Sequence, residues 1–130
     1  MIYLDTSVAL AQLLAEDQRP PAWLWDETLV ASRLLEYELW TRVHARKLAR
    51  SHTEAVHGLL ARVALLELSP PVLTRALELF PKPVRTLDAL HLASLDYFRR
   101  NGQSIDLASY DRCMVTAARA MGIRVADLGA

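Results

Sequence analysis

The chain has 130 residues, a length that fits one domain of ordinary size. Fifteen basic residues balance fifteen acidic ones, which argues against tight, nonspecific binding to long nucleic acid. This balance of charge is compatible with an enzyme that holds only a short segment of its substrate. The hydrophobic fraction of 52% is enough for a sizeable core.

In chain order, short apolar runs alternate with segments rich in helix-forming residues. Pro20 and Pro21 end the first helix, Ser32 can cap the long third helical segment, and Ser51 or Thr53 can cap the helix after it. The predicted elements are a strand at 1–4, a helix at 8–14, a helical turn at 23–26, a strand at 28–31, helices at 33–50 and from 51 or 53 to about 63, a strand at 65–68, helices at 72–80 and 86–100, a strand at 105–109, a helix at 112–121 and a strand at 123–126. This alternation is typical of an α/β domain with a parallel sheet.

The cysteine content and the longest apolar runs bear on location. The single cysteine, Cys113, rules out an intramolecular disulfide and fits a reducing compartment. Because it follows Arg112 and precedes Met114 on a predicted helix, we expect a buried, inert thiol. No apolar run reaches the roughly 18 residues of a membrane span, and Asp5 interrupts the first apolar residues too early for a signal peptide. A cytoplasmic protein is therefore expected.

Two acidic residues follow predicted strands directly. Asp5 ends the first apolar run, and Asp111 comes just after the strand at 105–109. In open α/β sheets, ligands bind beyond the carboxyl ends of the strands, which is where these carboxylates are expected. Thr6 beside Asp5 and Ser109 beside Asp111 can orient a carboxylate or a bound water.

Two further acids belong to helices. Asp88 shares a helical stripe with Leu92 and Leu95, so it should face inward, where an unpaired charge is costly. Glu38 lies in a helix that is apolar almost all round, so periodicity does not decide between it and Glu36.

Three of these acids also have a structural interpretation. Asp5 and Asp111 occupy helix-capping positions, and Asp88 lies where a helix dipole favours an acid. Several carboxylates at one end of a sheet would nevertheless repel one another, and one or two Mg²⁺ or Mn²⁺ ions would neutralise them. Oxygen-rich carboxylate sites suit these hard cations.

Four segments together resemble PIN domains, especially the VapC toxins of bacterial and archaeal toxin–antitoxin pairs. The resemblance covers essentially the whole chain, and the segments occur in the family's order. They are Ile2-Tyr3-Leu4-Asp5-Thr6-Ser7, Ala31-Ser32-Arg33-Leu34-Leu35-Glu36-Tyr37-Glu38-Leu39, Arg85-Thr86-Leu87-Asp88-Ala89-Leu90-His91-Leu92-Ala93 and Ser109-Tyr110-Asp111-Arg112. The third segment is the most specific of the four.

The resemblance implies a single PIN domain over residues 1–130, with a three-layer α/β/α fold around a short-stranded, mostly parallel sheet. It implies an endoribonuclease that hydrolyses RNA phosphodiester bonds with Mg²⁺ or Mn²⁺. It also favours Glu38 over Glu36, and it implies a homodimer silenced by a cognate antitoxin. The implied metal ligands are Asp5, Glu38, Asp88 and Asp111, with Thr6 and Ser109 supporting them.

Other polar residues have less specific interpretations. His91, one turn after Asp88, is expected to be a satisfied core histidine, with a hydrogen bond to Asp88 as the alternative. Arg112 faces either RNA or solvent. Four basic residues along the predicted long helix form either a solvated face or an RNA-facing strip: Arg42, Arg46, Lys47 and Arg50.

Two other functions compete with the ribonuclease. One is a catalytically silent PIN module that binds RNA or a protein partner. The other is a receiver-like signalling domain, which also clusters acids around Mg²⁺. The receiver interpretation fits poorly, because paired acids after the first strand and an acceptor aspartate on a middle strand do not occur.

Overall fold

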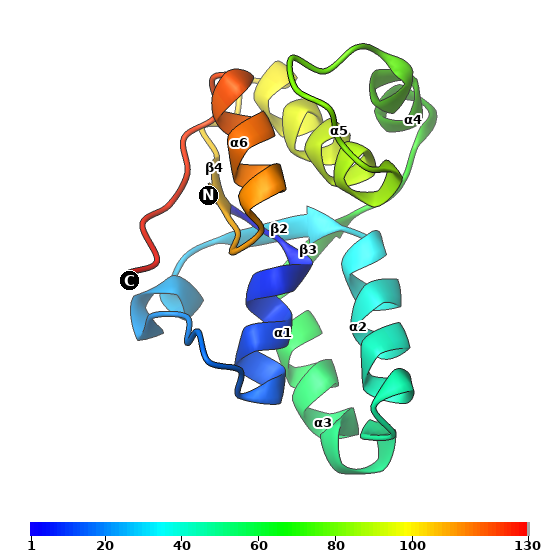
Figure 1. Cartoon of the computed structure of the whole chain (residues 1–130), viewed down its shortest axis with the longest axis vertical. Coiled ribbons are helices and arrows are strands. Elements are labelled where there is room, and N and C mark those ends of the chain that lie inside the picture. Colours follow the sequence, from blue (N-terminus) through cyan, green and yellow to red (C-terminus); the bar gives the residue numbers. More distant parts are fainter. Residues whose placement is uncertain (130) are drawn as a thin grey trace.

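The computed structural model describes residues 1–129 and has three layers, with a sheet between two layers of helices (Figure 1). The sheet has the order β3-β2-β1-β4, and all its neighbouring strands are parallel. Its strands are β1 (Ile2–Leu4), β2 (Leu29–Ser32), β3 (Val63–Leu66) and β4 (Asp106–Ala108). The predicted α/β/α fold class is thereby confirmed.

The helices divide between the two faces of the sheet. Ile2 and Leu4 of β1 pack in one core with α1, α2 and α3, whereas Tyr3 between them packs in a second core with α5 and α6. This is the two-residue alternation of a strand that is buried on both faces. The helical segments are α1 (Thr6–Leu14), the 3₁₀ turn η1 (Ala22–Asp26), α2 (Leu34–Ala45), α3 (Ala49–Leu60), α4 (Pro70–Leu77), α5 (Thr86–Arg100) and α6 (Arg112–Ala120). Within residues 1–129, none of these helices combines the length and apolar character that a membrane span requires.

The strand order creates a switch point beside β1. From β1 the chain first adds β2 and β3 on one side, and it then crosses over to place β4 on the other side. The backbone N–H of Asp5 donates to the carbonyl of Ala108 at 3.0 Å, so the carboxyl ends of β1 and β4 adjoin. Ligand sites of open α/β sheets lie at such a crevice.

The predicted long helix at 33–50 is wrong, because α2 ends at Ala45 and α3 begins at Ala49. Lys47 adopts a positive φ of 57°, and the N–H of Leu48 reaches back to the carbonyl of Val43 at 2.9 Å. This is a helix-ending pattern that usually uses glycine. Leu48 packs against the core shared by α1, α2 and α3, and this burial favours the reversal.

The predicted start of the next helix at Ser51 or Thr53 is also wrong. The Ser51 hydroxyl donates to the carbonyl of Leu48, and the Thr53 hydroxyl donates to the carbonyl of Ala49. Both hydroxyls therefore donate to backbone carbonyls that lie earlier in the chain, and neither caps the backbone N–H groups at the start of the helix.

Several other boundaries differ from the predictions. The strand expected at 65–68 begins at Val63, and the helix expected at 72–80 covers Pro70–Leu77. The strand expected at 123–126 is reduced to a single parallel bridge between Val125 and Leu107. The bounds predicted for α5 are confirmed.

Cys113 is exposed, so the expected buried thiol is wrong. Helix α6 is amphipathic, and it turns Met114, Ala117 and Ala118 toward the core shared with α5. Cys113, one position before Met114, consequently falls on the outer face.

Candidate functional site

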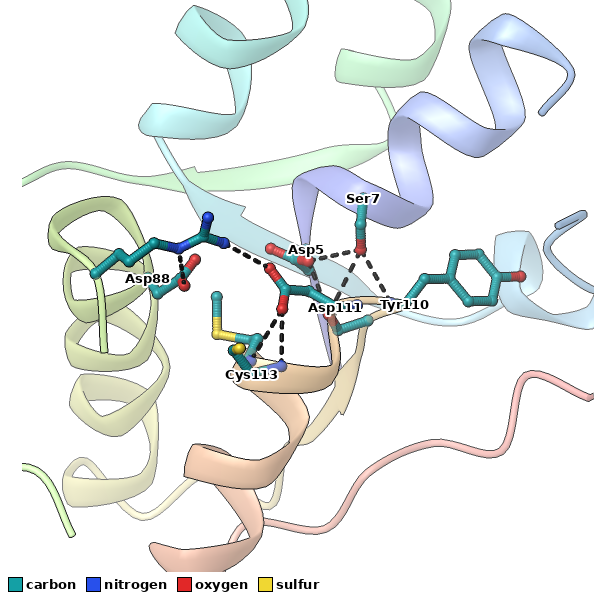
Figure 2. Close-up of polar contacts among 9 residues, drawn as sticks. Asp5, Ser7, Asp88, Tyr110, Asp111 and Cys113 are labelled. Carbon is teal, nitrogen blue, oxygen red and sulfur yellow. Dashed lines mark hydrogen bonds and ion pairs between the residues drawn. The ribbon is translucent and has the colours of Figure 1, made fainter. Parts of the chain in front are cut away.

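Four acidic side chains line one pocket at the switch point of the sheet. We call this cavity the acid pocket, and its acids come from four parts of the chain. Figure 2 shows three of them, Asp5, Asp88 and Asp111. Asp5 follows β1, Glu38 lies on α2, Asp88 lies on α5, and Asp111 precedes α6. The pocket is also lined by Thr6, Ser7, Leu10, Arg42, Arg85, Thr86, Leu87 and His91.

Asp5 is buried, and two hydroxyl groups hold its side chain. Ser7 Oγ donates to Asp5 Oδ2 at 2.6 Å, and Ser109 Oγ donates to the same oxygen at 2.8 Å. Asp5 is the N-cap residue of α1, as expected from its position, but its carboxylate makes no capping bond to that helix. Its carboxylate is instead oriented by one residue of α1 and one residue that follows β4.

The two predicted supporting hydroxyl groups bond to acids other than the ones expected. Thr6, expected beside Asp5, donates to Glu38 Oε1 at 3.0 Å, and Ser109, expected to serve Asp111, bonds to Asp5. Ser109 also accepts the backbone N–H of Asp111 at 3.0 Å. Both hydroxyls therefore support the acid set, but each orients a different carboxylate from the one that sequence proximity suggested.

Glu38 points into the acid pocket, whereas Glu36 does not line it. The Glu36 side chain is more exposed and pairs with Arg33 at 3.7 Å. Glu38 Oε1 accepts bonds from Thr6 on α1 and from Nε2–H of His91 on α5, the latter at 2.5 Å. Glu38, and not Glu36, therefore lies with the other three acids, and its role as a metal ligand stays a prediction.

His91 is a buried, satisfied histidine, as expected, but its acidic partner is Glu38 and not Asp88. Its Nδ1 lies 2.8 Å from the hydroxyl of Tyr3, which also accepts the backbone N–H of Ser32 at 3.1 Å. Burial opposes the charged imidazole, but the bond to Glu38 and the charges of nearby acids outweigh it and raise the pKa of His91. No sequence pattern singled out Tyr3, although a buried tyrosine hydroxyl needs a hydrogen-bond partner.

Asp88 is buried with Leu92 and Leu95, so its predicted inward orientation is confirmed. Burial raises the pKa of Asp88, and the negative charge of Asp111 raises it further. Arg85 lowers the pKa but only partly offsets these two effects. The ionised form of Asp88 is therefore under-compensated, and a nearby positive charge would stabilise it.

Asp111 has two roles in the geometry. Its Oδ1 accepts the backbone N–H groups of Cys113 at 2.9 Å and Met114 at 3.2 Å, so the capping interpretation is confirmed for this acid. Its Oδ2 faces Arg85, with 3.3 Å between Oδ2 and Nη2. The cap fixes one carboxylate oxygen and leaves the other oriented toward the pocket.

Arg85 and Ser7 were missed as site residues. Arg85 immediately precedes α5, and its Nε lies 3.4 Å from Asp88 Oδ2 while its Nη2 reaches Asp111. Its position three residues before Asp88 is the signal that could have identified it. The Ser7 hydroxyl accepts the backbone N–H of Tyr110 at 2.9 Å and so links the segments after β1 and β4.

Of the basic residues weighed for RNA contact, Arg42 lines the acid pocket. Arg112 is exposed and lines a different pocket, together with Gln18 and Thr116. The break between α2 and α3 divides the predicted basic strip, so its residues do not follow one continuous helix.

The acid set supplies oxygen donors of the kind that Mg²⁺ and Mn²⁺ prefer. Within residues 1–129, however, no three Asp, Glu, His or Cys side chains are arranged so that they could hold a metal ion. The structure thus brings the four acids to one pocket, and Arg85 lies between two of them, Asp88 and Asp111.

Comparison with known proteins agrees with this fold. The sequence model of the PIN domain family matches residues 2–120. Ribonuclease VapC47 of Mycobacterium tuberculosis (strain CDC 1551 / Oshkosh) is 31% identical to the chain, over 100% of the chain and 98% of its own length. Ribonuclease VapC35 of Mycobacterium tuberculosis, from strains CDC 1551 / Oshkosh and ATCC 25618 / H37Rv, is 32% identical over 99% of the chain and 98% of its own length. The chain belongs to the PIN domain family.

Proposed function

We propose that the chain is a divalent-metal-dependent endoribonuclease that hydrolyses RNA phosphodiester bonds, and that it is the toxin of a type II toxin–antitoxin pair. The observation that carries this proposal is the meeting of Asp5, Glu38, Asp88 and Asp111 in one pocket at the switch point of the sheet. The relatives from Mycobacterium tuberculosis support it, because both are named as ribonucleases and the match covers 98% of each.

Mg²⁺ or Mn²⁺ is the cofactor that fits this donor set, with Asp5, Glu38 and Asp88 as the main ligands and Asp111 as an outer or second-metal ligand. The ion would lower the pKa of a bound water and neutralise charge on the phosphate that is attacked. Because the described side chains are not arranged around an ion, we propose that the carboxylates and Arg85 rearrange when the ion binds.

The surrounding polar residues support this role by fixing individual oxygens. Ser7 and Ser109 hold Asp5 Oδ2, and Thr6 and His91 hold Glu38 Oε1. A carboxylate that is already oriented loses less conformational freedom when it becomes a ligand. Thr6 and Ser109 are therefore supporting residues whose loss should weaken metal binding and cleavage together.

The direct test is cleavage of a panel of structured RNAs with Mg²⁺ or Mn²⁺, compared with EDTA. Asp5→Asn and Asp88→Asn should reduce cleavage by about 10²- to 10³-fold, the scale on which loss of transition-state charge stabilisation is measured. Asp106→Asn is a matched control, because Asp106 lies at the amino end of β4 and pairs with Arg124 away from the pocket.

Equal cleavage by wild type and both pocket variants would show that the assigned site is wrong. Metal binding without cleavage of any RNA in the panel would favour the catalytically silent module.

The proposed partners of the chain are a cognate antitoxin and a second copy of the chain. Co-purification with the product of a small neighbouring gene, and sedimentation of the isolated chain, would test these two partners.

A further inference from the structure

Arg85 is an exposed arginine that rests on two members of the acid set. Its side chain is 77% exposed, yet its Nε lies 3.4 Å from Asp88 and its Nη2 lies 3.3 Å from Asp111. In the part of the chain that the structure describes, it is the one Lys or Arg side chain paired with any of the four acids. Arg85 therefore provides a positive charge that partly balances Asp88 and Asp111.

The geometry of these contacts indicates a pairing that is easily broken. Both distances are longer than the 2.8 Å between Arg75 Nε and Asp96, where both side chains are nine-tenths buried. An ion pair with an exposed arginine is screened by water and contributes little to stability. Arg85 can consequently leave the two carboxylates without unfolding α5, whose core contacts come from Leu92 and Leu95.

The same side chain has the chemistry to bind the substrate. A guanidinium group offers several N–H donors in one plane, which match the oxygens of a phosphate. Arg85 lines the same pocket as the four acids, so a phosphodiester drawn into that pocket meets this group. A divalent cation on Asp88 and Asp111 would also repel Arg85 from its resting position, because like charges at short range are unfavourable.

We propose that Arg85 exchanges between two partners: it rests on Asp88 and Asp111 in the metal-free protein, and it binds an RNA phosphate once these carboxylates hold a metal. This inference rests on the proposed ribonuclease function and adds a substrate-binding residue to it. Arg85 should therefore have opposite effects on two steps. It weakens metal binding, because it competes with the metal for Asp88 and Asp111, and it strengthens RNA binding.

The first experiment measures Mn²⁺ binding calorimetrically with no RNA present. Arg85→Gln should bind Mn²⁺ about two- to fivefold more tightly than wild type, which is the effect of removing one screened, competing charge. Arg124→Gln is the matched control, because Arg124 is 75% exposed and pairs with Asp106 at the far end of β4. It should leave Mn²⁺ affinity unchanged.

The second experiment measures kcat/KM for RNA cleavage at saturating Mn²⁺. Arg85→Gln should lower kcat/KM by about 10- to 100-fold, as expected for the loss of a charged hydrogen bond. Arg85→Lys should recover part of this loss, because the ammonium keeps the charge without the planar donors. Arg124→Gln should cleave like wild type.

Weaker or unchanged Mn²⁺ binding by Arg85→Gln would overturn the exchange, since a merely structural role predicts no gain in affinity. Wild-type cleavage rates in Arg85→Gln would overturn the phosphate contact while leaving the ribonuclease proposal standing. Failure of wild type to bind Mn²⁺ or to cleave RNA would instead overturn the proposed function, and with it the role of Arg85.

Discussion

Helix α5 carries two buried aspartates, two turns apart, that are each 8% exposed and are surrounded very differently. Asp96 accepts a 2.8 Å bond from the buried Arg75 of α4 and lies within 3.5 Å of two further arginines, Arg99 and Arg100. Asp88 has one exposed arginine at 3.4 Å, and a second carboxylate, Asp111, contacts the same arginine.

Burial alone therefore does not distinguish a structural acid from a functional one. Charge balance separates the two residues: Asp96 has several positive partners and ties α4 to α5, whereas Asp88 is left with a raised pKa beside other acids. A carboxylate that the protein leaves under-compensated is suited to an added cation. The predictions below follow from this contrast.

The largest effect on stability is expected at Asp96. Asp96→Ala should lower the free energy of unfolding by about 3 kcal/mol, because it leaves the buried Arg75 without its main partner. Asp88→Ala should cost much less in EDTA, since it removes repulsion together with a weak pair. Urea unfolding of both variants checks this, and equal losses would remove the distinction between the two sites.

Asp111 is expected to contribute to stability, as Asp96 does, although it lies in the acid pocket with Asp88. Asp111→Ala should cost about 1 kcal/mol in metal-free protein, because Oδ1 caps α6 through the amides of Cys113 and Met114. Asp111→Asn should keep most of this stability, because asparagine caps helices well. Thermal unfolding of both variants in EDTA tests the cap, and a loss in Asp111→Asn as large as in Asp111→Ala would argue against it.

A smaller, pH-dependent effect is expected for Asp88→Asn. The pKa of Asp88 is raised in the folded protein, so the ionised carboxylate lowers stability as the pH rises through that folded value. The asparagine variant should therefore have the higher midpoint of thermal unfolding at neutral pH in EDTA. This gain should disappear at acidic pH, where Asp88 is protonated in both states. A gain that was the same at both pH values would contradict this origin.

Much of the sheet and three of the four acids were predicted from local sequence pattern. Asp5 and Asp111 were expected beyond strand ends because each directly follows an apolar run, and the inward stripe of α5 indicated Asp88. These features depend on neighbours within one or two turns, which periodicity records. The position of Glu38 was expected only from the family resemblance, since its helix is apolar almost all round.

Two of the features that were missed depend on contacts distant in sequence. The bond from Ser109 to Asp5 joins residues 104 positions apart, and no local pattern contains it. The turn at Lys47 has neither glycine nor proline, and it forms because Leu48 packs into the core with α1 and α3. In both cases tertiary packing decided what local propensity left open.

The most direct test of the contrast on α5 is the change in unfolding midpoint when millimolar Mn²⁺ replaces EDTA, measured for wild type, Asp88→Asn and Asp96→Asn. A cation that binds the folded pocket should raise the midpoint. We predict similar increases for wild type and Asp96→Asn, each relative to its own metal-free midpoint, and a much smaller increase for Asp88→Asn. An equal increase in all three proteins, or none in wild type, would contradict the assignment of Asp88 to a metal site.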